Sequence, residues 1–525
     1  MTGAPADAQR YFRTNNYSLF AQNDWKVRPN FTLNLGMRYE YFSPLSEKEG
    51  RLTNLDISNG LANARTVTVD QFHESDKNNF APRVGFAYSP NIGGFGGLLR
   101  EGRAVLRGGF GVSYNRIPNV VFSNARNNPP FIANLNLCCA FSPADLARLG
   151  IRFNVGRDRT PFGFPGNPQL AQGIDPVTGF PVSGGAEVYA AFDIRTPYVY
   201  SYSLDLQNEL FWGMTSSIAY QGSTSHKLVR TVPEQFLFQY ATGRFINGLG
   251  AIFVPHTDVN ANYNALIARL SRRLTSGFSF DANYRWSKSI DTVSGEFGAA
   301  TNQTFPVDQR EERGPSDFDV RHNFVVSALY ELPFFREGRG LSRALLGGFQ
   351  LNPIITYNTG FPWTPKSGRG VNTPAGFFGP LRPVGYVGGA LDDTSNDTFI
   401  RPGGNFPFRQ TGLAGCSQNN PGLCYFIPPP EGRTSFADVR PGVGRNSFRG
   451  PRYFSTDLSV VKETALPFLR LGEEANLELR ANIFNLFNQT NLAPIPEVFI
   501  DSPNFGRATG GLAGRVVELQ ARFNF

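Results

Sequence analysis

The sequence predicts an all-β fold, and within that class a transmembrane antiparallel β-barrel of about thirteen strands. Three observations carry this prediction. Many segments of ten or more residues alternate between apolar and polar side chains. Short turns and long loops alternate between these segments. No continuous apolar run reaches the roughly 18 residues that a transmembrane helix needs.

The first two predicted strands show the alternation most clearly. The segment 17–27, YSLFAQNDWKV, has apolar residues at alternate positions, with Phe20 as the exception. After the turn at 28–30, the segment 31–41, FTLNLGMRYEY, places Phe, Leu, Met and Tyr on one face and Thr, Asn, Gly, Arg and Glu on the other. This period of two indicates a strand with one apolar and one polar face.

The same hairpin pattern recurs along the chain. The further predicted strands are 79–89 and 103–115, 198–210 and 216–223, 264–274 and 278–287, 323–332 and 349–358, 454–462 and 476–487, and 514–525. A strand of about 11 residues is about 36 Å long and, tilted by about 45°, spans the roughly 25 Å apolar band of an outer-membrane barrel. Strands of globular proteins have about five or six residues, so a soluble sandwich is the weaker alternative.

The connections fall into two classes. Short turns are expected near 28–30, 90–102, 211–213, 274–276, 333–346 and 466–474, and long loops near 42–78, 116–196, 225–260, 290–318, 361–450 and 489–513. This one-sidedness is typical of membrane barrels, which have short periplasmic turns and long extracellular loops. Residues 1–16 are predicted to be a loop that precedes the barrel portion, 17–525.

Composition and charge exclude some classes of function. The net charge of +8 is spread over single Lys and Arg residues, without a basic block of five or six, so we expect no nucleic-acid partner. The start, MTGAPADAQR, has neither the basic region nor the apolar core of a secretory signal. The strand pattern therefore carries the membrane prediction alone.

Five segments, together with the closing strand, carry a family resemblance. They are TPYVYSYSLDLQNEL…AYQGSTSHKL (196–228), NYNALIARLSRRLTSGFSFDANYRWSKSID (262–291), GPSDFDVRHNFVVSALYELPF (314–334), GRNSFRGPRYFSTDLSVVK (444–462) and LRANIFNLFNQTN…FGR (479–507). In this order they resemble the Oar-like branch of TonB-dependent outer-membrane receptors. The resemblance covers most of the chain from residue 196 onward.

The resemblance implies more than the strands that the sequence contains. Such receptors have a signal peptide, a TonB box and a plug domain before a barrel of about 22 strands with a plugged lumen. With about thirteen strands predicted here, we expect about nine to be missing, and the chain to be the C-terminal portion of a receptor with its C-terminus in the periplasm. The aromatic end of the last strand is then implied to be a signal read by the barrel-assembly machinery. Its alternating residues are Val517, Leu519, Ala521, Phe523 and Phe525.

Few residues suggest a specific site. Cys416 and Cys424 flank a segment with Asn-Pro-Gly, which favours a turn, so they are a disulfide candidate, with two free thiols as the alternative. The acidic stretches DVNANYN (258–264) and LDDTSND (391–397) are more typical of solvated loops than of calcium sites. We therefore predict no metal, no cofactor and no catalytic residue.

Aromatic residues in the predicted loops are the remaining candidates for ligand contact. Those singled out are Trp363, Phe377, Phe378 and Tyr425. Such rings can stack on sugars or hold an apolar ligand, and they can equally pack long loops against one another.

The functional prediction is transport. We expect a Gram-negative outer-membrane protein whose loops bind a bulky solute and whose lumen conducts it, with outer-membrane lipid around the barrel. TonB would act only through the absent plug. An adhesin or envelope-organising barrel without transport is the alternative, and a passive porin would need a complete barrel without a plug. No enzymatic activity is expected.

Overall fold

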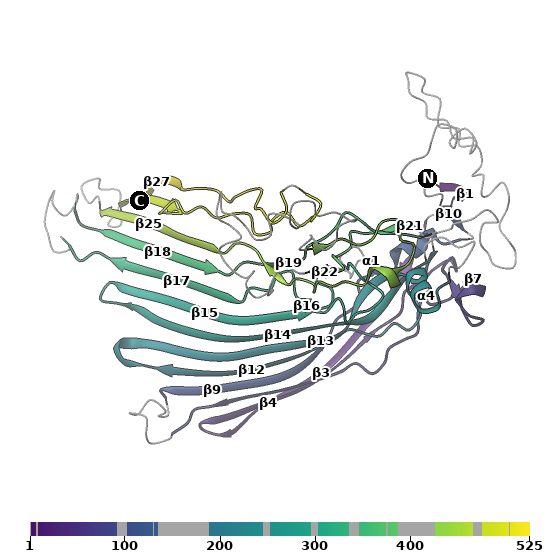
Figure 1. The fold of residues 1–525 in the computed structure, drawn as a ribbon. Coiled ribbons are helices and arrows are strands. Elements are labelled where there is room, and N and C mark those ends of the chain that lie inside the picture. Colours follow the sequence, from purple (N-terminus) through teal and green to yellow (C-terminus); the bar gives the residue numbers. More distant parts are fainter. Residues whose placement is uncertain are drawn as a thin grey trace.

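One long sheet dominates the molecule. The computed structural model describes residues 2–6, 9–91, 102–129, 131–134, 188–244, 252–295, 303–334, 346–373, 376–386, 426–465, 475–502 and 504–524. Within these residues, thirteen long strands follow one another across the sheet in sequence order, each antiparallel to its neighbours (Figure 1). Two short strands, β11 (Val188–Tyr189) and β16 (Gly314–Pro315), pair at its margins. The all-β prediction and the expected strand order are confirmed.

The bounds of the long strands lie close to the predicted ones, except that β13 ends later and β14 begins earlier. They are β3 (Asn16–Arg28), β4 (Phe31–Phe42), β8 (Phe80–Tyr88), β9 (Ala104–Tyr114), β12 (Tyr198–Glu209), β13 (Met214–Pro233), β14 (Ile252–Thr275), β15 (Phe278–Asp291), β17 (His322–Glu331), β18 (Phe349–Asn358), β25 (Tyr453–Ala465), β26 (Asn476–Phe484) and β27 (Val516–Asn524). Most have nine to 14 residues. The register is continuous along several pairs, as in the twelve matched residues of β12 and β13.

The tight turns lie together at one end of the strands. Between β14 and β15 the two turn residues, Ser276 and Gly277, have φ values of 54° and 75°. Two successive left-handed residues match the twist of a hairpin. Trp212 and Gly213, between β12 and β13, have φ values of 57° and 68°. The long connections leave the strands at the opposite end, on the right-hand side of Figure 1.

The predicted loop at 225–260 is wrong. β13 continues to Pro233 and β14 starts at Ile252, so only α4 (Glu234–Thr242) and the residues after it connect them. Here Val232 and Val254 are paired across the strands and are 0% and 1% exposed. Their chain neighbours Pro233 and Pro255, which point to the other face, are buried as well. Both faces of the sheet are therefore covered here, and the alternation that marks a strand is lost.

Two further expectations also differ from the structure. The stretch 258–264, interpreted as a solvated loop, lies inside β14. Residues 1–16, expected to be a loop, include the short strands β1 (Thr2–Ala6) and β2 (Phe12–Arg13). Each pairs with a distant short strand, β10 (Ile132–Asn134) and β5 (Ser46–Glu47). Short pairings of this kind leave no periodic signal in a sequence.

The sheet has one apolar and one polar face. Leu204, Ile218 and Leu266 lie on the apolar face and are 47%, 57% and 40% exposed. Asp205, Ser217 and Arg269 lie an odd number of positions from these residues along the same strands, so they point to the other side, where they line one hollow. A face that leaves many large apolar side chains exposed suits a lipid surrounding rather than water. We call the two sides the apolar face and the polar face.

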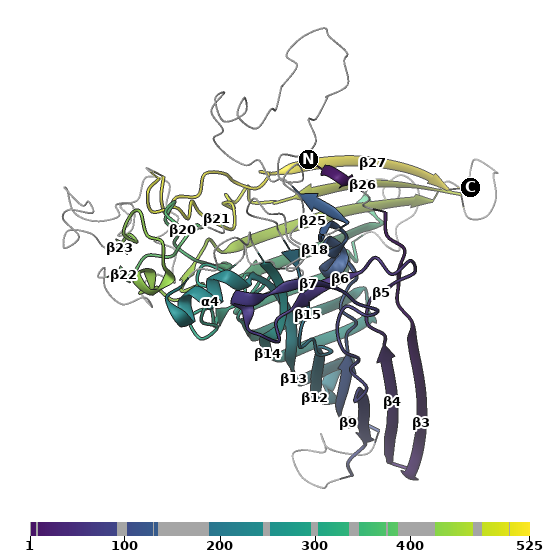
Figure 2. The ribbon, with the colours of Figure 1, turned by 90° about the vertical axis from the view of Figure 1, so that its right-hand side faces the viewer.

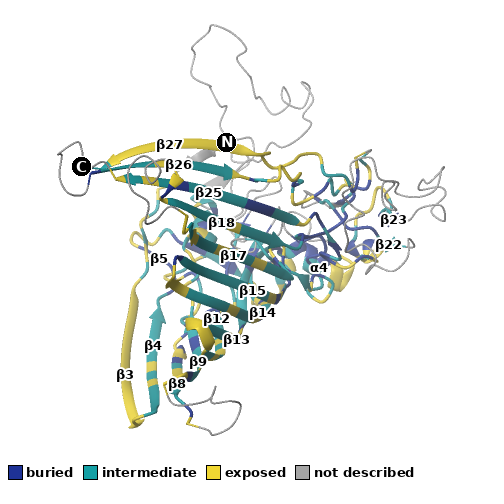
Figure 3. Ribbon diagram, turned by 90° about the vertical axis from the view of Figure 1, so that its left-hand side faces the viewer, coloured by how far each residue is buried: buried dark blue, intermediate teal, exposed yellow. Residues whose placement is uncertain are grey.

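Most of the hydrophobic core lies in the long connections. Four clusters of buried side chains are found there, with members such as Phe72, Phe122, Phe436 and Phe505, and one cluster also includes Ile252 and Val254 of β14. We call the described long connections the loop layer: 43–79, 115–134, 188–197, 234–244, 292–321, 359–386, 426–452 and 485–515. Figure 3 shows the buried residues gathered near α4 and β22, while β3 and β27 are exposed.

Short strand pairs organise the loop layer. These are β6 (Thr53–Asp56) with β7 (Arg65–Thr68), β19 (Pro362–Trp363) with β24 (Phe448–Arg449), β20 (Val371–Thr373) with β21 (Gly376–Phe378), and β22 (Gly385–Tyr386) with β23 (Phe426–Ile427). A short helix, α1 (Val120–Ser123), lies among them. They satisfy backbone groups that burial would otherwise leave unpaired.

The sheet is open in this structure. It curves strongly, with β27 at one edge and β3 at the other (Figure 2). Because an even number of antiparallel steps separates these strands, β3 and β27 run in the same direction, from the loop layer towards the tight turns. Among the described strands, β3 pairs only with β4, and β27 only with β26.

Two glycines on the apolar face make room for aromatic rings. A Cβ on Gly222 would lie 2.2 Å from Tyr202 Cε2, and one on Gly108 would lie 2.4 Å from Phe86 Cε1. Each ring therefore packs against the backbone of a glycine on the neighbouring strand, where no side chain is in the way. Such aromatic–glycine pairs fix the register of adjacent strands.

We predict that Gly222→Ala destabilises the folded sheet, by about 1–3 kcal/mol, because the added methyl group forces Tyr202 out of its position. Gly109→Ala is the matched control, since its Cβ would meet no atom closer than 3.5 Å. The measurement is the temperature at which the folded species unfolds in detergent on a gel. Equal unfolding temperatures for the two variants would contradict the claim that the packing of the Tyr202 ring requires a glycine at position 222.

Candidate functional site

The polar face of the central strands forms a hollow of about 820 Å³. Its lining comes from seven strands and lies towards the tight turns. It includes Arg107, Asp205, Gln207, Thr215, Ser217, Arg269, Asp281, Ser327 and Asn352. Alternation brings them together, because every second residue of adjacent strands points to the same side. The surface they form is mainly polar, with Leu329 and Ile354 among the apolar members of the lining.

The charged side chains of this hollow form hydrogen bonds with other side chains of the same face. Arg269 Nε donates to Asp281 Oδ2 at 2.8 Å. The Ser217 hydroxyl donates to Asp205 at 2.6 Å, and Arg107 Nη1 donates to Gln207 at 3.2 Å. Cross-strand pairs of this kind keep the polar side chains on the wall. The hollow thus presents both charges to water, as suits a passage for a hydrated solute.

At the other end of the strands the loop layer folds over the polar face. The Ser287 hydroxyl, on β15, donates to the carbonyl of Val320 at 2.8 Å. Ser289 N donates to Asp319 Oδ1 at 2.6 Å, and the Ser289 and Ser316 hydroxyls are 2.8 Å apart. Ser287 and Ser289 are consequently 5% and 7% exposed, although they belong to the polar face. The segment 292–321 thus covers this part of the wall.

A buried arginine joins the cover to the sheet. Arg445 is 5% exposed, and its Nη1 donates to Asp291 Oδ1, at the end of β15, at 2.6 Å. Its Nη2 donates to the Ser294 hydroxyl at 2.5 Å and to Asp317 at 3.2 Å. Removing one partner of such a pair leaves a buried charge without compensation, which is strongly destabilising. Arg445 therefore links two connections that are far apart in the sequence.

Two more ion pairs extend this network. Arg382 and Glu312 are both 0% exposed and pair at 3.0 Å. Burial lowers the pKa of Arg382, and the Glu312 carboxylate opposes that effect. Arg449 pairs with Asp319 and also donates to the Asp319 carbonyl at 2.7 Å. These pairs tie the segments 292–321, 359–386 and 426–452 into one body.

The predicted ligand-contact aromatics that the structure describes are buried. Trp363 is 2% exposed and packs against Phe448 and Phe505, with ring centroids 5.3 and 5.9 Å apart. Phe378 is 9% exposed and packs against Phe436 at 5.3 Å. Both rings hold loop segments together here, which was the other role considered. Contact with a ligand stays a prediction for them.

Other predicted residues lie outside the described residues. The side chain of Phe377 is not described, and Tyr425, Cys416, Cys424 and Phe525 lie in undescribed positions, as does the stretch 391–397. The disulfide therefore stays a prediction. In β27, Val517, Leu519 and Phe523 are 56%, 80% and 40% exposed at an edge of the sheet. Ala521 lies on the same strand, opposite Leu479.

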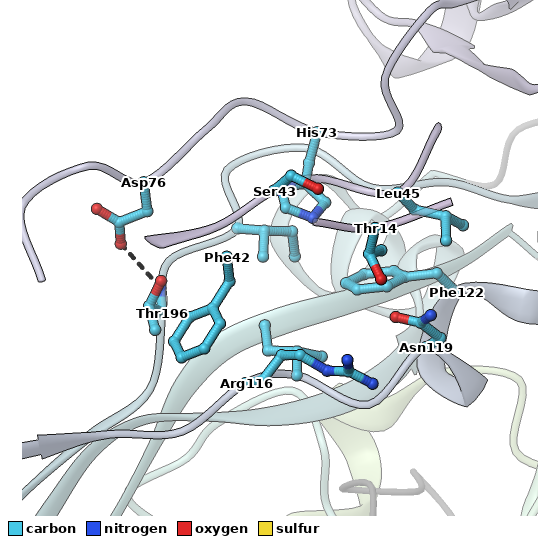
Figure 4. A pocket seen from close by; sticks show the side chains of 12 residues that line it. Thr14, Phe42, Ser43, Leu45, His73, Asp76, Arg116, Asn119, Phe122 and Thr196 are labelled. Atoms are coloured by element: carbon cyan, nitrogen blue, oxygen red, sulfur yellow. Dashed lines mark hydrogen bonds between the residues drawn. The ribbon is translucent and has the colours of Figure 1, made fainter. Parts of the chain in front are cut away.

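A small pocket lies where the loop layer meets β3, β4 and β9 (Figure 4). His73, Asp76 and Arg116 line it together with Phe42 and Phe122, and its volume of about 30 Å³ suits water rather than a bulky solute. Asp76 accepts a hydrogen bond from Thr196 N at 2.9 Å. Burial lowers the pKa of His73, against the hydrogen bond with the Glu74 carbonyl. The pocket lies between loop segments and shares no lining residue with the hollow on the polar face.

Metal binding finds no support in the part of the chain that the structure describes. There, no group of three or more His, Cys, Asp or Glu side chains is placed to hold an ion. Asp258, in the stretch considered for calcium, pairs instead with Arg230 at 2.7 Å. No helix among the described residues is long and apolar enough to cross a membrane.

A sheet with long strands in sequence order, an apolar outer face and a polar inner face defines a membrane β-barrel protein. Comparison with known families agrees: the sequence matches the outer membrane beta barrel domain over residues 1–518. The chain belongs to this family, and its place is the outer membrane. The polar face is accordingly the lumen wall. No curated protein matches the chain significantly.

Several solved structures of outer-membrane proteins are partly similar to the chain. The ferripyoverdine receptor of Pseudomonas aeruginosa has 9% identity and a TM-score of 0.42, covering 98% of this chain and 39% of that one. The ferric-catecholate import receptor Fiu of E. coli K12 has 10% identity and a TM-score of 0.42, and the match covers 98% of this chain and 45% of that one. The outer membrane transporter YddB of Escherichia coli has 10% identity and a TM-score of 0.46, and the match covers 97% of this chain and 54% of that one. The chain thus spans between 39% and 54% of the length of these proteins.

We predict that Arg445→Ala loosens the cover while the strands stay folded. Loss of a buried charged partner costs about 3–5 kcal/mol. Amide hydrogen exchange should therefore speed up in 303–321 and 440–450 and stay unchanged in β14 and the first half of β15. The control is Arg310→Ala, because Arg310 is 89% exposed and pairs only at the surface, with Asp308. Equal exchange in both variants would contradict the role of Arg445.

Proposed function

We propose that this chain is the barrel portion of a TonB-dependent outer-membrane transport protein. The observation that carries the proposal is a polar lumen hollow beneath a packed loop layer. In the proposed mechanism, the loop layer binds a bulky solute outside the cell. The solute then passes along the polar wall once an energised plug, supplied outside these 525 residues, releases it. The resemblance of the five sequence segments to Oar-like receptors supports the same assignment.

The edges of the sheet support a larger barrel. Backbone N–H and C=O groups cannot stay unpaired in the hydrocarbon region, so both β3 and β27 need partners there. Because these strands run in the same direction, they cannot close the barrel against each other in an antiparallel ladder. A second copy of the sheet meets the same obstacle. An odd number of further strands satisfies both edges, and the nine strands inferred from a barrel of about 22 meet this condition.

The orientation and partners belong to the same proposal. The tight turns face the periplasm and the loop layer faces outward, as in other outer-membrane barrels. β27 ends on the side of the tight turns, so the C-terminus would be periplasmic. Its exposed apolar series, Val517, Leu519, Ala521 and Phe523 with Phe525, would be read by the assembly machinery. TonB would engage the plug and not this portion.

Transport requires the cover over the lumen to move. The network around Arg445 holds the cover closed in this structure, and solute binding to the loop layer would have to compete with its contacts. The hydroxyls of Ser289 and Ser316, 2.8 Å apart, join the sheet directly to the cover. Replacing both with cysteine places two thiols within reach of a disulfide.

We predict that Ser289→Cys combined with Ser316→Cys abolishes uptake until a reductant is added. The test uses a deletion strain that carries the variant in the whole protein and grows on defined iron, oligosaccharide or peptide sources. Each single cysteine variant is the control and should grow like the wild type. Growth that is equal with and without the reductant, once the disulfide is verified, would contradict a moving cover.

The same strain separates transport from adhesion. If the protein is an adhesin or an envelope-organising barrel, its deletion leaves growth unchanged on all these sources and reduces surface attachment. If it is a transporter, deletion reduces growth on at least one source. Growth that is unaffected on every source would overturn the transport proposal.

A further inference from the structure

A β-bulge on β13 places two consecutive side chains on the apolar face. The pairing of β13 with β14 shifts between Ser225 and Leu228, so β13 contains one extra residue there. Lys227, within the bulge, has a φ of 56°. The His226 ring lies 5.2 Å from the Tyr198 ring, and Lys227 Nζ lies 5.6 Å from the same ring. In a regular strand, neighbouring residues would point to opposite faces.

A lysine in this conformation needs an explanation. The left-handed region is unfavourable for residues with a Cβ, and glycine adopts it without a penalty. A strained residue that persists in a fold points to a functional demand on its side chain. Here the bulge holds the Lys227 cation against Tyr198 on the apolar face.

The surroundings of Lys227 suit an anionic lipid headgroup. Tyr198 also packs against Tyr200 at 5.2 Å and Tyr114 at 5.9 Å, which makes an aromatic patch on β9 and β12. Tyrosines of this kind lie at the level of lipid headgroups in membrane proteins. The patch lies near the loop end of the strands, where β9 ends at Tyr114 and β12 begins at Tyr198.

The charge on this part of the apolar face has one sign. By the register, the other residues on this face here are Tyr202, Gly222, Thr224, Asn262, Asn264, Trp286, Lys288 and Ile290. None of them is acidic. Asn264 accepts hydrogen bonds from the hydroxyls of Tyr202 at 2.8 Å and Tyr220 at 2.7 Å, and Lys288 is its cross-strand neighbour. Two lysines, a histidine and several tyrosines thus lie on this face of the described strands. The carboxylate that interacts electrostatically with Tyr114, that of Asp76, is 8% exposed and accepts a hydrogen bond from Thr196 N at 2.9 Å.

We propose that this patch, centred on Tyr198, His226 and Lys227, binds a phosphate-bearing lipid of the outer leaflet. Lys227 contacts the phosphate, Lys288 adds a second positive charge, and the tyrosine rings pack against the headgroup and the first part of the acyl chains. The inference rests on the proposed orientation, in which the loop end faces outward. In the outer leaflet, the phosphorylated glycolipid carries the matching charge.

The test is the binding of lipid A with two phosphates to the protein purified from outer membranes in mild detergent, measured by native mass spectrometry. Lys227→Gly removes the charge and relieves the strain, so it should fold at least as well as the wild type. We expect about fivefold weaker binding from the loss of one lysine near the surface. Lys227→Arg should keep the affinity. Lys26→Gly, on the polar face of β3, removes an equal charge from the other side and should leave the affinity unchanged.

Three results would overturn the inference. The first is that Lys227→Gly binds lipid A with wild-type affinity, and the second is that the wild type binds lipid A without phosphates as tightly as lipid A with two. The third is that millimolar inorganic phosphate displaces the lipid from the wild type and from Lys227→Gly to the same extent. A preference for phosphatidylglycerol over lipid A would overturn the assignment to the outer leaflet. Because the readout is lipid binding by the purified protein, it does not depend on uptake. Either this inference or the transport proposal can therefore fail without the other.

Discussion

The structure depends on the pairing of backbone hydrogen bonds between neighbouring strands. In the hydrocarbon region no water replaces a missing partner, so every strand must be bonded along its length. The continuous register of β12 with both β9 and β13 meets this demand. Long strands, tight turns at one end and an apolar outer face all follow from it. The same constraint makes the two unpaired edges the strongest reason to propose further strands.

A second source of stability acts in the loop layer. Among the described residues, most of the sheet leaves its apolar face exposed, as suits lipid, whereas the loop layer buries aromatic clusters and ion pairs as a soluble domain does. Arg445 joins the two parts, because it bonds both to Asp291 at the end of β15 and to the cover. The stability of the loop layer therefore has a different physical source from that of the barrel wall.

The alternation of apolar and polar residues made the strands of the sheet predictable from the sequence. It did not predict the contacts that cover the polar face. The strand Phe349–Asn358 has its predicted bounds, because one of its faces is apolar and the other polar. The prediction failed at 225–260, where Val232 on one face of the sheet and Pro233 on the other are both buried. Arg445 and Asp291 are 154 residues apart, and no local pattern marks them as partners. Likewise, composition cannot tell whether Trp363 contacts a ligand or packs in a cluster. The polar lumen face was foreseeable from alternation, whereas the cover over it depended on tertiary contacts alone.

The central claim is that adjacent residues of one strand face lipid and an aqueous lumen. It is tested most directly by labelling Leu206→Cys and Gln207→Cys, in a background with the four native cysteines replaced by serine, in intact outer membranes. A charged, water-soluble thiol reagent should modify the cysteine at 207 and leave the one at 206 unmodified. Equal modification of both, or modification of the cysteine at 206 alone, would contradict the account.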